Sequence, residues 1–234
     1  MSTKSSIQNH SSSKLNVRKL VLLAVFSAMA FILVLVVNIP IVPGVEFLKY
    51  EPKDVIITIG AFLFGPLESI LMSVVVSFIE MVTISTTGPI GMIMNIVSTV
   101  GFATIAGLIY RKNHTMKGAV AGLICGVASM TILMLLWNYL ITPLYMGVPR
   151  ETVVQMLMPA FLPFNLIKGA INAAFTMILY KPIVTALRKT GLVGESASMS
   201  KTSSNHSKQI WSIIISVFVL ATVALILLVM NHVI

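Results

Sequence analysis

Long apolar runs, separated by polar turns and basic clusters, make up most of this sequence. One run extends from Leu20 to Val37, and further runs follow one another between Val55 and Tyr180 with few charged residues among them. A helix needs about 20 predominantly apolar residues to cross the hydrocarbon core of a bilayer, and several of these runs approach or reach that length. The pattern therefore predicts an all-α protein that is embedded in a membrane.

Proline, glycine and charged residues divide most of the apolar sequence into six segments. The expected helices lie at about residues 20–37, 55–64, 67–82, 90–110, 118–139 and 160–180. The second of them is short, because at 1.5 Å per residue it covers only about half of the hydrocarbon core. Pro40 and Pro43 each remove a backbone donor, so residues 38–54 are expected to form a mixed-charge loop, with Pro52-Lys53-Asp54 as a helix start.

The same division predicts four regions. Residues 1–19 are polar and Ser-rich and form an N-terminal tail, whereas residues 20–189 hold the six expected helices, with a long Pro-containing connection at 140–159. Residues 190–209 are again Ser-rich and are typical of a flexible linker. The final apolar run at 210–230 is long enough to span a bilayer, so we expect an appended seventh helix there.

Composition and charge agree with a membrane protein whose N-terminus lies in the cytoplasm. Of 234 residues, 57% are hydrophobic and 10% are charged, whereas a soluble domain carries roughly 25% charged residues. The net charge of +9 comes largely from basic residues before the first helix, after the fourth and after the sixth. These loops lie on one side of the membrane, as the positive-inside rule requires, if the short second helix counts as a crossing. This placement argues against nucleic-acid binding.

Sequence motifs for catalysis and for ATP binding are missing. The sequence contains no Gly-x-x-x-x-Gly-Lys-Ser/Thr loop, no cluster of His, Cys, Asp and Glu with metal-ligand spacing, and no recognisable Ser-His-Asp set. The single cysteine, Cys125, excludes an intramolecular disulfide and a cysteine-based metal cluster. A binding or transport role is therefore favoured over an enzymatic one.

Two ionisable residues, Glu80 and Lys168, fall inside expected membrane helices. A charge at that depth costs at least a few kcal/mol, so it indicates a functional site. Asn165, Lys168 and Asn172 share one face of the sixth helix, where they bind a ligand in one interpretation. In the other, Lys168 reaches the membrane interface and the asparagines join neighbouring helices. Glu80 either pairs with Lys168, accepts the hydroxyl groups of a ligand, or faces water.

Further candidate polar groups lie near the ends of the helices. The turn Thr86-Thr87-Gly88 leads into the fourth helix, where free backbone N–H groups can donate to ligand oxygens; an ordinary tight turn is the alternative. Asn95 on that helix either binds the ligand or joins two helices. Asn138 lies between aromatic residues typical of a membrane interface. Its amide can donate a hydrogen bond to the edge of a planar ring and accept one from it at the same time.

Two helices carry small residues at a spacing of four. Ala24-x-x-x-Ala28 lies on the first, and Gly118-x-x-x-Gly122-x-x-x-Gly126 lies on the fifth. Such faces allow helices to approach one another closely. Packing within the bundle accounts for the glycine face, whereas either internal packing or a partner protein accounts for the alanine face.

Together, these features resemble the substrate-binding S components of energy-coupling-factor (ECF) vitamin transporters, particularly the riboflavin-specific branch. The resemblance covers about residues 15–190 and is most specific from Phe47-Leu-Lys-Tyr-Glu-Pro-Lys-Asp-Val55 through Ile59-Gly-Ala-Phe-Leu-Phe-Gly-Pro66. The Thr86-Thr-Gly88 turn, Asn95 and the Asn165-x-x-Lys168-Gly169 run support it. The seventh helix, the Ser-rich linker and the acidic third helix depart from the family pattern.

The resemblance implies a six-helix domain that binds riboflavin near the outer face of the cell membrane, beneath a lid formed by the loop after the first helix. It implies no cofactor and no catalysis by this chain, because a T component and two cytosolic ATPases would supply the energy. Ala24 and Ala28 would dock on the T component. The candidate ligand contacts are Leu48, Tyr50, Glu80, Thr87, Gly88, Asn95, Asn138, Asn165 and Lys168.

Within this set, Asn138, Asn165 and Lys168 would read the polar edge of the isoalloxazine ring. The Thr87-Gly88 turn and Glu80 would meet the ribityl hydroxyls. The alternatives are an S component for another vitamin, a stand-alone membrane carrier, and an intramembrane enzyme.

Overall fold

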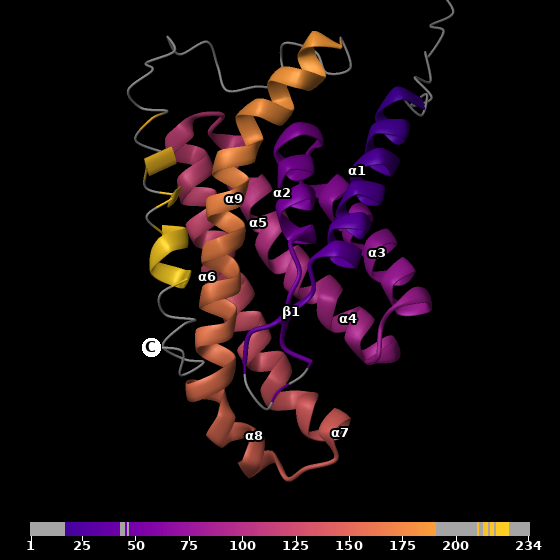
Figure 1. Ribbon diagram of the computed structural model, residues 1–234, viewed down its shortest axis with the longest axis vertical. Coiled ribbons are helices and arrows are strands. Elements are labelled where there is room, and N and C mark those ends of the chain that lie inside the picture. The colour runs from indigo at the N-terminus through magenta and orange to yellow at the C-terminus, as the bar shows by residue number, and fades with distance from the viewer. Residues whose placement is uncertain are drawn as a thin grey trace, which may run out of the picture.

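The computed structural model describes residues 17–42, 45, 47–190, 210, 213–214, 216–217 and 219–224. In this part of the chain the structure is a helical bundle with one short antiparallel strand pair (Figure 1). Its elements are α1 (Val17–Val36), β1 (Ile39–Pro40), β2 (Lys49–Tyr50), α2 (Lys53–Phe64), α3 (Pro66–Thr83), α4 (Gly88–Thr99), the π-helix η1 (Val100–Thr104), α5 (Ile105–Lys112), α6 (Met116–Leu140), α7 (Thr142–Met146), α8 (Arg150–Met156), the π-helix η2 (Leu157–Phe161) and α9 (Leu162–Lys189).

Among the described residues, five helical stretches are long and apolar enough to cross a membrane. They cover Val17–Val36, Pro66–Thr83, Gly88–Lys112, Met116–Leu140 and Arg150–Leu187. Many of their large apolar side chains face outward, as a lipid-facing surface requires. The prediction of a helical membrane protein is therefore confirmed. The short helix α2 has 12 residues and is not among these five.

The helices follow the predicted segments, with two differences. The Pro-containing connection at 140–159, in which no helix was placed, contains α7 and α8. Pro143 lies in the first turn of α7 and Pro149 is the N-cap residue of α8. The first backbone N–H groups of a helix have no intrahelical partner, so a proline at this end costs no hydrogen bond. These prolines therefore start helices and do not break them. Helix α9 also continues through Pro182 to Lys189, whereas the prediction ended it at Tyr180.

Helix α2 begins deep in the bundle and ends at a sharp turn. Gly65 has a φ of 121°, which an L side chain rarely adopts, and Pro66 starts α3 directly after it. In Figure 1, α2 occupies only the upper part of the bundle, and the strand pair lies below it. In the segment that joins α1 to α2, residues 37–52, the described residues from Ile41 onward are buried or half-buried, whereas Asn38, Ile39 and Pro40 are exposed.

The α1–α2 connection, residues 37–52, forms a buried cluster with the opposite side of the bundle. Its side chains Ile41, Val42, Val45, Leu48 and Tyr50 belong to the same buried group as Val153, Phe161, Phe164, Ile167 and Ile171 of α8, η2 and α9. This apolar packing fixes the connection between the helices. It places Phe47, Leu48 and the residues around them in the interior.

The glycine face of α6 packs inside the bundle, as predicted. A Cβ atom added at Gly122 would lie 2.7 Å from the carbonyl oxygen of Ala106, and one at Gly126 would lie 2.7 Å from that of Phe102. These glycines therefore let α6 approach α5 and η1 closely. By contrast, Ala24 and Ala28 are exposed on α1.

Several predictions concern residues that the structure covers only in part. The predicted tail is described only from Val17, where α1 begins, and the Ser-rich linker lies outside the described residues apart from Thr190. In the predicted seventh helix, the described residues 210, 213–214, 216–217 and 219–224 are helical. Val223 is buried and belongs to the cluster of the α1–α2 connection.

Candidate ligand-binding site

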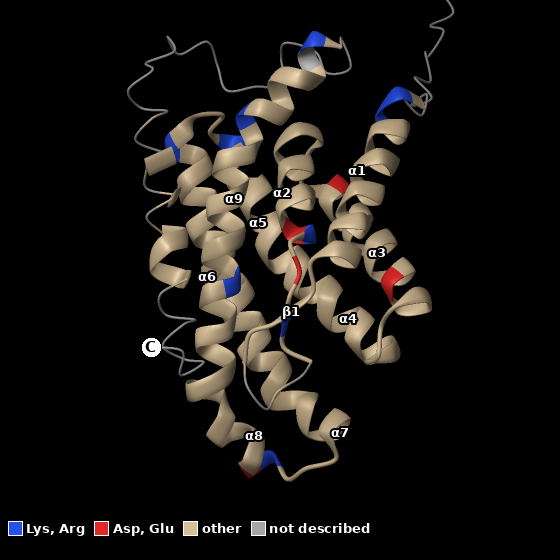
Figure 2. Cartoon of the chain, in the orientation of Figure 1, with Lys and Arg blue, Asp and Glu red and all other residues tan. Residues whose placement is uncertain are grey.

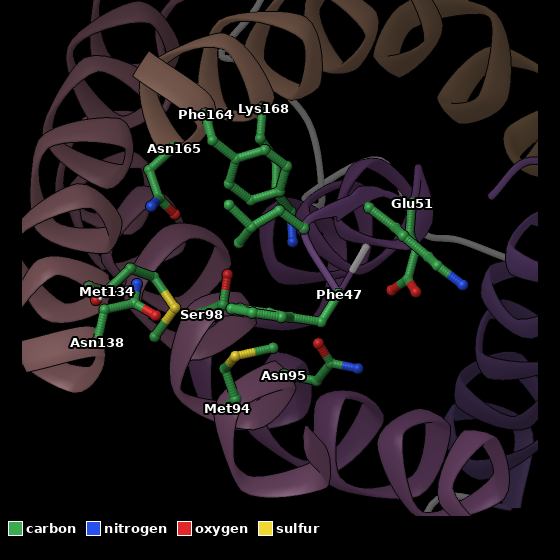
Figure 3. Close-up of a pocket in the computed structure, with 12 residues that line it drawn as sticks. Phe47, Glu51, Met94, Asn95, Ser98, Met134, Asn138, Phe164, Asn165 and Lys168 are labelled. Atoms are coloured by element: carbon green, nitrogen blue, oxygen red, sulfur yellow. Dashed lines mark hydrogen bonds between the residues drawn. The ribbon is translucent and has the colours of Figure 1, made fainter. Parts of the chain in front are cut away.

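A pocket lies between the α1–α2 connection and three long helices (Figure 3). Its walls combine apolar, aromatic, amide and charged side chains from four parts of the chain. They are Phe47, Leu48, Lys49 and Glu51 of the connection, Met94, Asn95 and Ser98 of α4, Met134 and Asn138 of α6, and Phe164, Asn165 and Lys168 of α9. Its free volume is about 40 Å³, enough for only a few water molecules.

Phe47 fills the middle of this pocket. Figure 3 shows its ring extending between Phe164 on one side and Met94 on the other, toward Ser98. The ring also packs against Phe161, with centroids 6.2 Å apart, and against Tyr145, with centroids 5.7 Å apart. The connection thus closes the pocket with an aromatic side chain.

Three polar side chains predicted from the sequence, Asn138, Asn165 and Lys168, line the pocket. Asn138 donates to the carbonyl oxygen of Met134 at 2.7 Å and accepts from the hydroxyl of Thr142 at 2.8 Å. Asn165 donates to the carbonyl oxygen of Phe161 at 2.7 Å. Lys168 lies one turn further along α9, and all three predicted side chains are buried. These bonds fix the two amides on the pocket wall, where their remaining donors and acceptors can form hydrogen bonds with a ligand.

A buried carboxylate, Asp54, stands behind Lys168. Its Oδ2 lies 3.4 Å from the Lys168 Nζ and accepts from the Asn172 Nδ2 at 3.2 Å. Its Oδ1 accepts from the Thr99 hydroxyl at 2.6 Å. Asp54 is wholly buried, and these partners provide the charge and hydrogen bonds that burial of a carboxylate requires.

A second buried ion pair joins α2 to α3. The Lys53 Nζ lies 2.7 Å from the Glu51 Oε2 and 2.5 Å from the Glu80 Oε2, and Asn95 donates to the same Glu80 oxygen at 3.0 Å. Of the three alternatives for Glu80, pairing with Lys168 is wrong, because its partner is Lys53. A carboxylate that faces water is also wrong, because Glu80 is only 3% exposed. Acceptance of ligand hydroxyls stays a prediction.

The reason for both errors is the depth at which α2 begins. Lys53 and Asp54 were expected at the end of a mixed-charge loop, as part of a helix start, and α2 does begin at Lys53, but both side chains are wholly buried. Because α2 begins inside the bundle, both residues lie among the membrane helices. Each forms an ion pair there with a residue of opposite charge. The remaining acidic residue of α3, Glu68, pairs with Lys19 of α1.

Tyr50 lies beside this network and does not line the pocket. Its hydroxyl donates to the Asn172 Oδ1 at 3.1 Å. Burial raises the pKa of the Tyr50 hydroxyl above its ordinary value, and the nearby Asp54 raises it further. The hydroxyl therefore remains protonated and can act as a donor over the physiological pH range.

The predicted contact residues fall into three groups. The first group lines the pocket and consists of Leu48, Asn95, Asn138, Asn165 and Lys168. The second group, Tyr50 and Glu80, does not line the pocket. Tyr50 forms a hydrogen bond with Asn172, and Glu80 forms one with Asn95. Thr87 is the N-cap residue of α4 and Gly88 is its first residue, and neither lines the pocket. The Thr87 hydroxyl instead lies 3.0 Å from that of Ser85, and Gly88 has a φ of 59°, so this segment also fits the alternative of an ordinary tight turn.

Several lining residues were not predicted. Ser98, Met134 and Phe164 lie three or four residues from Asn95, Asn138 and Lys168, respectively, on the same helices, so the helical spacing could have identified them. Phe47, Lys49 and Glu51 carry no such signal, because the path of the connection depends on packing across the whole bundle.

The site offers hydrogen-bonding groups beside apolar contact area. Within the described ranges, no group of three or more His, Cys, Asp or Glu side chains could hold a metal ion. The amides and the ammonium group offer hydrogen bonds, and the aromatic and methionine side chains offer apolar contact area.

Comparisons with known proteins agree on one family. The sequence profile of the family described as "ECF transporter, substrate-specific component" matches residues 18–180. Riboflavin transporter FmnP of Bacillus subtilis (strain 168) is 30% identical over 178 residues, which cover 71% of this chain and 93% of the relative. Riboflavin transporter RibU of Streptococcus thermophilus is 28% identical over 184 residues, covering 74% and 86%.

A solved structure also resembles the fold. It is described as "Structure and mechanism of the S component of a bacterial ECF transporter". The two structures align with a TM-score of 0.62 and 26% sequence identity, and the match covers 73% of this chain and 98% of the other. The chain therefore belongs to the family of substrate-specific (S) components of ECF transporters.

Proposed function

We propose that this protein is the riboflavin-binding S component of an ECF-type importer, which takes up the vitamin together with a T component and two cytosolic ATPases. The observation that carries this proposal is the pocket itself, where buried Asn138, Asn165 and Lys168 face apolar and aromatic walls. The names of the two relatives, both riboflavin transporters, support the choice of vitamin.

The pocket suits the two parts of riboflavin. Its isoalloxazine ring is planar and apolar on both faces, which matches Met94, Met134 and Phe164. The ring edge carries carbonyl acceptors and an N–H donor. Two amides and an ammonium group can satisfy both kinds of group, so we assign the ring edge to Asn138, Asn165 and Lys168.

We assign the ribityl hydroxyls to the part of the pocket near Asn95. Glu80 accepts a hydrogen bond from the Asn95 amide, and Leu48 of the connection adds apolar contact area. The Thr87-Gly88 turn precedes the same helix as Asn95 and remains a proposed contact, as does Glu80. Tyr50 would contribute through Asn172 and the network around Asp54.

Binding requires the α1–α2 connection to move. A pocket for a molecule of this kind usually measures about 300–1,000 Å³, far more than the free volume of about 40 Å³ found here. Phe47 occupies the position that a ring would take, so it must withdraw when the ligand enters (Figure 3). This supports the role of the connection as a lid.

The distribution of charge supports insertion in the cell membrane with the N-terminus in the cytoplasm. Figure 2 shows the Lys and Arg residues concentrated at the end of the bundle where α1 begins and α9 ends. This end would be cytoplasmic by the positive-inside rule. Helix α2, together with the buried connection, would complete the sixth crossing of the domain at 20–189, followed by the linker at 190–209 and the seventh helix at 210–230.

The exposed alanines of α1 are the proposed docking site for the T component. Ala24 and Ala28 leave a shallow region on a helix whose other outward side chains are large, among them Val21, Val25 and Ile32. Close approach of a partner helix favours such small residues.

Copurification and uptake together test this function. The protein is purified in mild detergent, and its visible absorbance is recorded; bands of bound flavin are expected. Uptake of riboflavin by cells is expected only when the T component and both ATPases are present with this chain. A protein that binds another vitamin instead of flavin, uptake without the ATPases, or chemical turnover by the purified chain would contradict the proposal.

A further inference from the structure

Asp54 is a buried charged residue that contacts Lys168 of the proposed site but does not itself line the pocket. It lies in the first turn of α2, and none of its surface is exposed. Burial of an ionised carboxylate is costly unless several partners compensate for it. The choice of these partners therefore indicates what the residue does.

The partners of Asp54 come from the helices on two sides of the pocket. Thr99 of α4 donates to Oδ1 at 2.6 Å, and Asn172 of α9 donates to Oδ2 at 3.2 Å. The Lys168 ammonium lies 3.4 Å from the same Oδ2. Among the described residues, Asp54 is the only carboxylate that pairs with Lys168.

A lysine needs such a partner to hold its position. Its ammonium group sits on a flexible four-carbon stem and carries three donors that rotate freely. The Asp54 carboxylate is itself held by Thr99 and Asn172, so it provides a fixed point for the Lys168 Nζ. The ammonium lies beside Asp54, and the same residue lines the pocket, so its remaining donors are available to a ligand there.

Building on the proposed riboflavin site, we propose that Asp54 is a positioning residue, which holds the Lys168 ammonium at the pocket wall so that it can donate to the ligand. Asp54 does not contact the ligand itself. Its effect on binding therefore passes through Lys168. This distinguishes it from a residue that only stabilises the bundle, whose loss would weaken binding whether or not Lys168 is present.

A double-mutant cycle tests this distinction. Riboflavin Kd is measured by titration for the wild type, Asp54→Asn, Lys168→Met and the double variant, each checked for folding by its thermal transition. We expect each single change to raise Kd about fivefold or more. The double variant is expected to bind within about twofold of Lys168→Met, because Asp54 has no further effect once the ammonium is gone. A double variant whose loss equals the product of the two single losses would overturn the positioning role.

A milder pair of variants decides the question if Asp54→Asn does not fold. Thr99→Val removes one hydrogen bond from the Asp54 carboxylate, whereas Thr104→Val removes a hydroxyl on the same continuous helix that bonds to Ser69 instead. We expect Thr99→Val to raise Kd only when Lys168 is present, and Thr104→Val to leave it unchanged within about twofold. Equal effects of the two changes would contradict the proposal.

The wild type separates this inference from the function on which it rests. A wild-type protein that binds no riboflavin would contradict the proposed function and remove the positioning role with it. A wild type that binds, combined with additive losses in the cycle, would contradict the positioning role alone.

Discussion

Each of the two buried lysines in the described core has a carboxylate partner. Lys53 lies between Glu51 and Glu80, and Lys168 lies beside Asp54. Such a pair adds little net stability compared with apolar residues of the same shape, but removal of one partner leaves a buried charge without compensation. The charges are therefore tolerated as a network, and their cost suggests that they are kept for function.

Substitution of Lys53 tests the energetics of this network. Lys53→Met removes the charge that compensates Glu51 and Glu80, so we expect a loss of about 3–5 kcal/mol in the free energy of unfolding. Denaturation in detergent micelles measures this loss. Lys112→Met, at the exposed end of α5, is the matched control and should change stability by less than about 0.5 kcal/mol. Equal stability of the two variants would contradict the network described here.

Substitution of Lys168 tests the ligand site. Lys168→Met removes a buried donor and should weaken riboflavin binding by about 1–3 kcal/mol, or roughly 5- to 150-fold in Kd. Lys117→Met, at the exposed start of α6, serves as the control and should bind as the wild type does. Isothermal titration measures both, and unchanged affinity in Lys168→Met would exclude a contact between this residue and the ligand.

At the scale of the secondary-structure elements, apolar runs and turn residues predicted most helices, because both depend on neighbours in sequence. The same local logic placed Asn165 and Lys168 on one face, and both line the pocket. It failed for Lys53 and Asp54, since a sequence pattern shows where a helix begins but not how deeply that end is buried. It also gave no indication of Phe47 in the pocket, because a connection follows packing with distant helices.

The close contact between α6 and α5 gives a prediction for the elements. Gly122→Val would place a side chain against the Ala106 carbonyl oxygen, which lies 2.7 Å from the position of the new Cβ. The helices must then separate, and we expect a loss of about 1–3 kcal/mol, measured as a lower thermal transition. Ala121→Val adds a similar side chain at the neighbouring exposed position and should have little effect. A normal transition in Gly122→Val would contradict this packing.

At the scale of the whole molecule, the binding pocket and the alanine face of α1 are separate features. The pocket lies inside the bundle, whereas Ala24 and Ala28 are on its surface. The resemblance to S components could be found from the sequence because it depends on short motifs such as the one at Phe47–Val55. The predicted seventh helix has no counterpart in that pattern, so its role could not be predicted.

This separation predicts that binding and transport can be affected independently. Ala28→Leu should leave riboflavin Kd unchanged but reduce uptake strongly in cells that contain the T component and ATPases, because the larger side chain prevents close docking. Ala128→Leu makes the same change at an exposed alanine of α6 and should leave both unaffected. Normal uptake by Ala28→Leu would show that docking occurs elsewhere.

The measurement that tests the central claim most directly is a riboflavin titration followed by tryptophan fluorescence. The chain has two tryptophans, and Trp137 lies beside Asn138 of the pocket wall. In the Trp211→Phe variant, the remaining signal reports on this position alone. We predict saturable quenching at nanomolar riboflavin, which Lys168→Met shifts to higher concentration. A folded protein that shows no quenching and carries no flavin would contradict the assignment of this pocket to riboflavin.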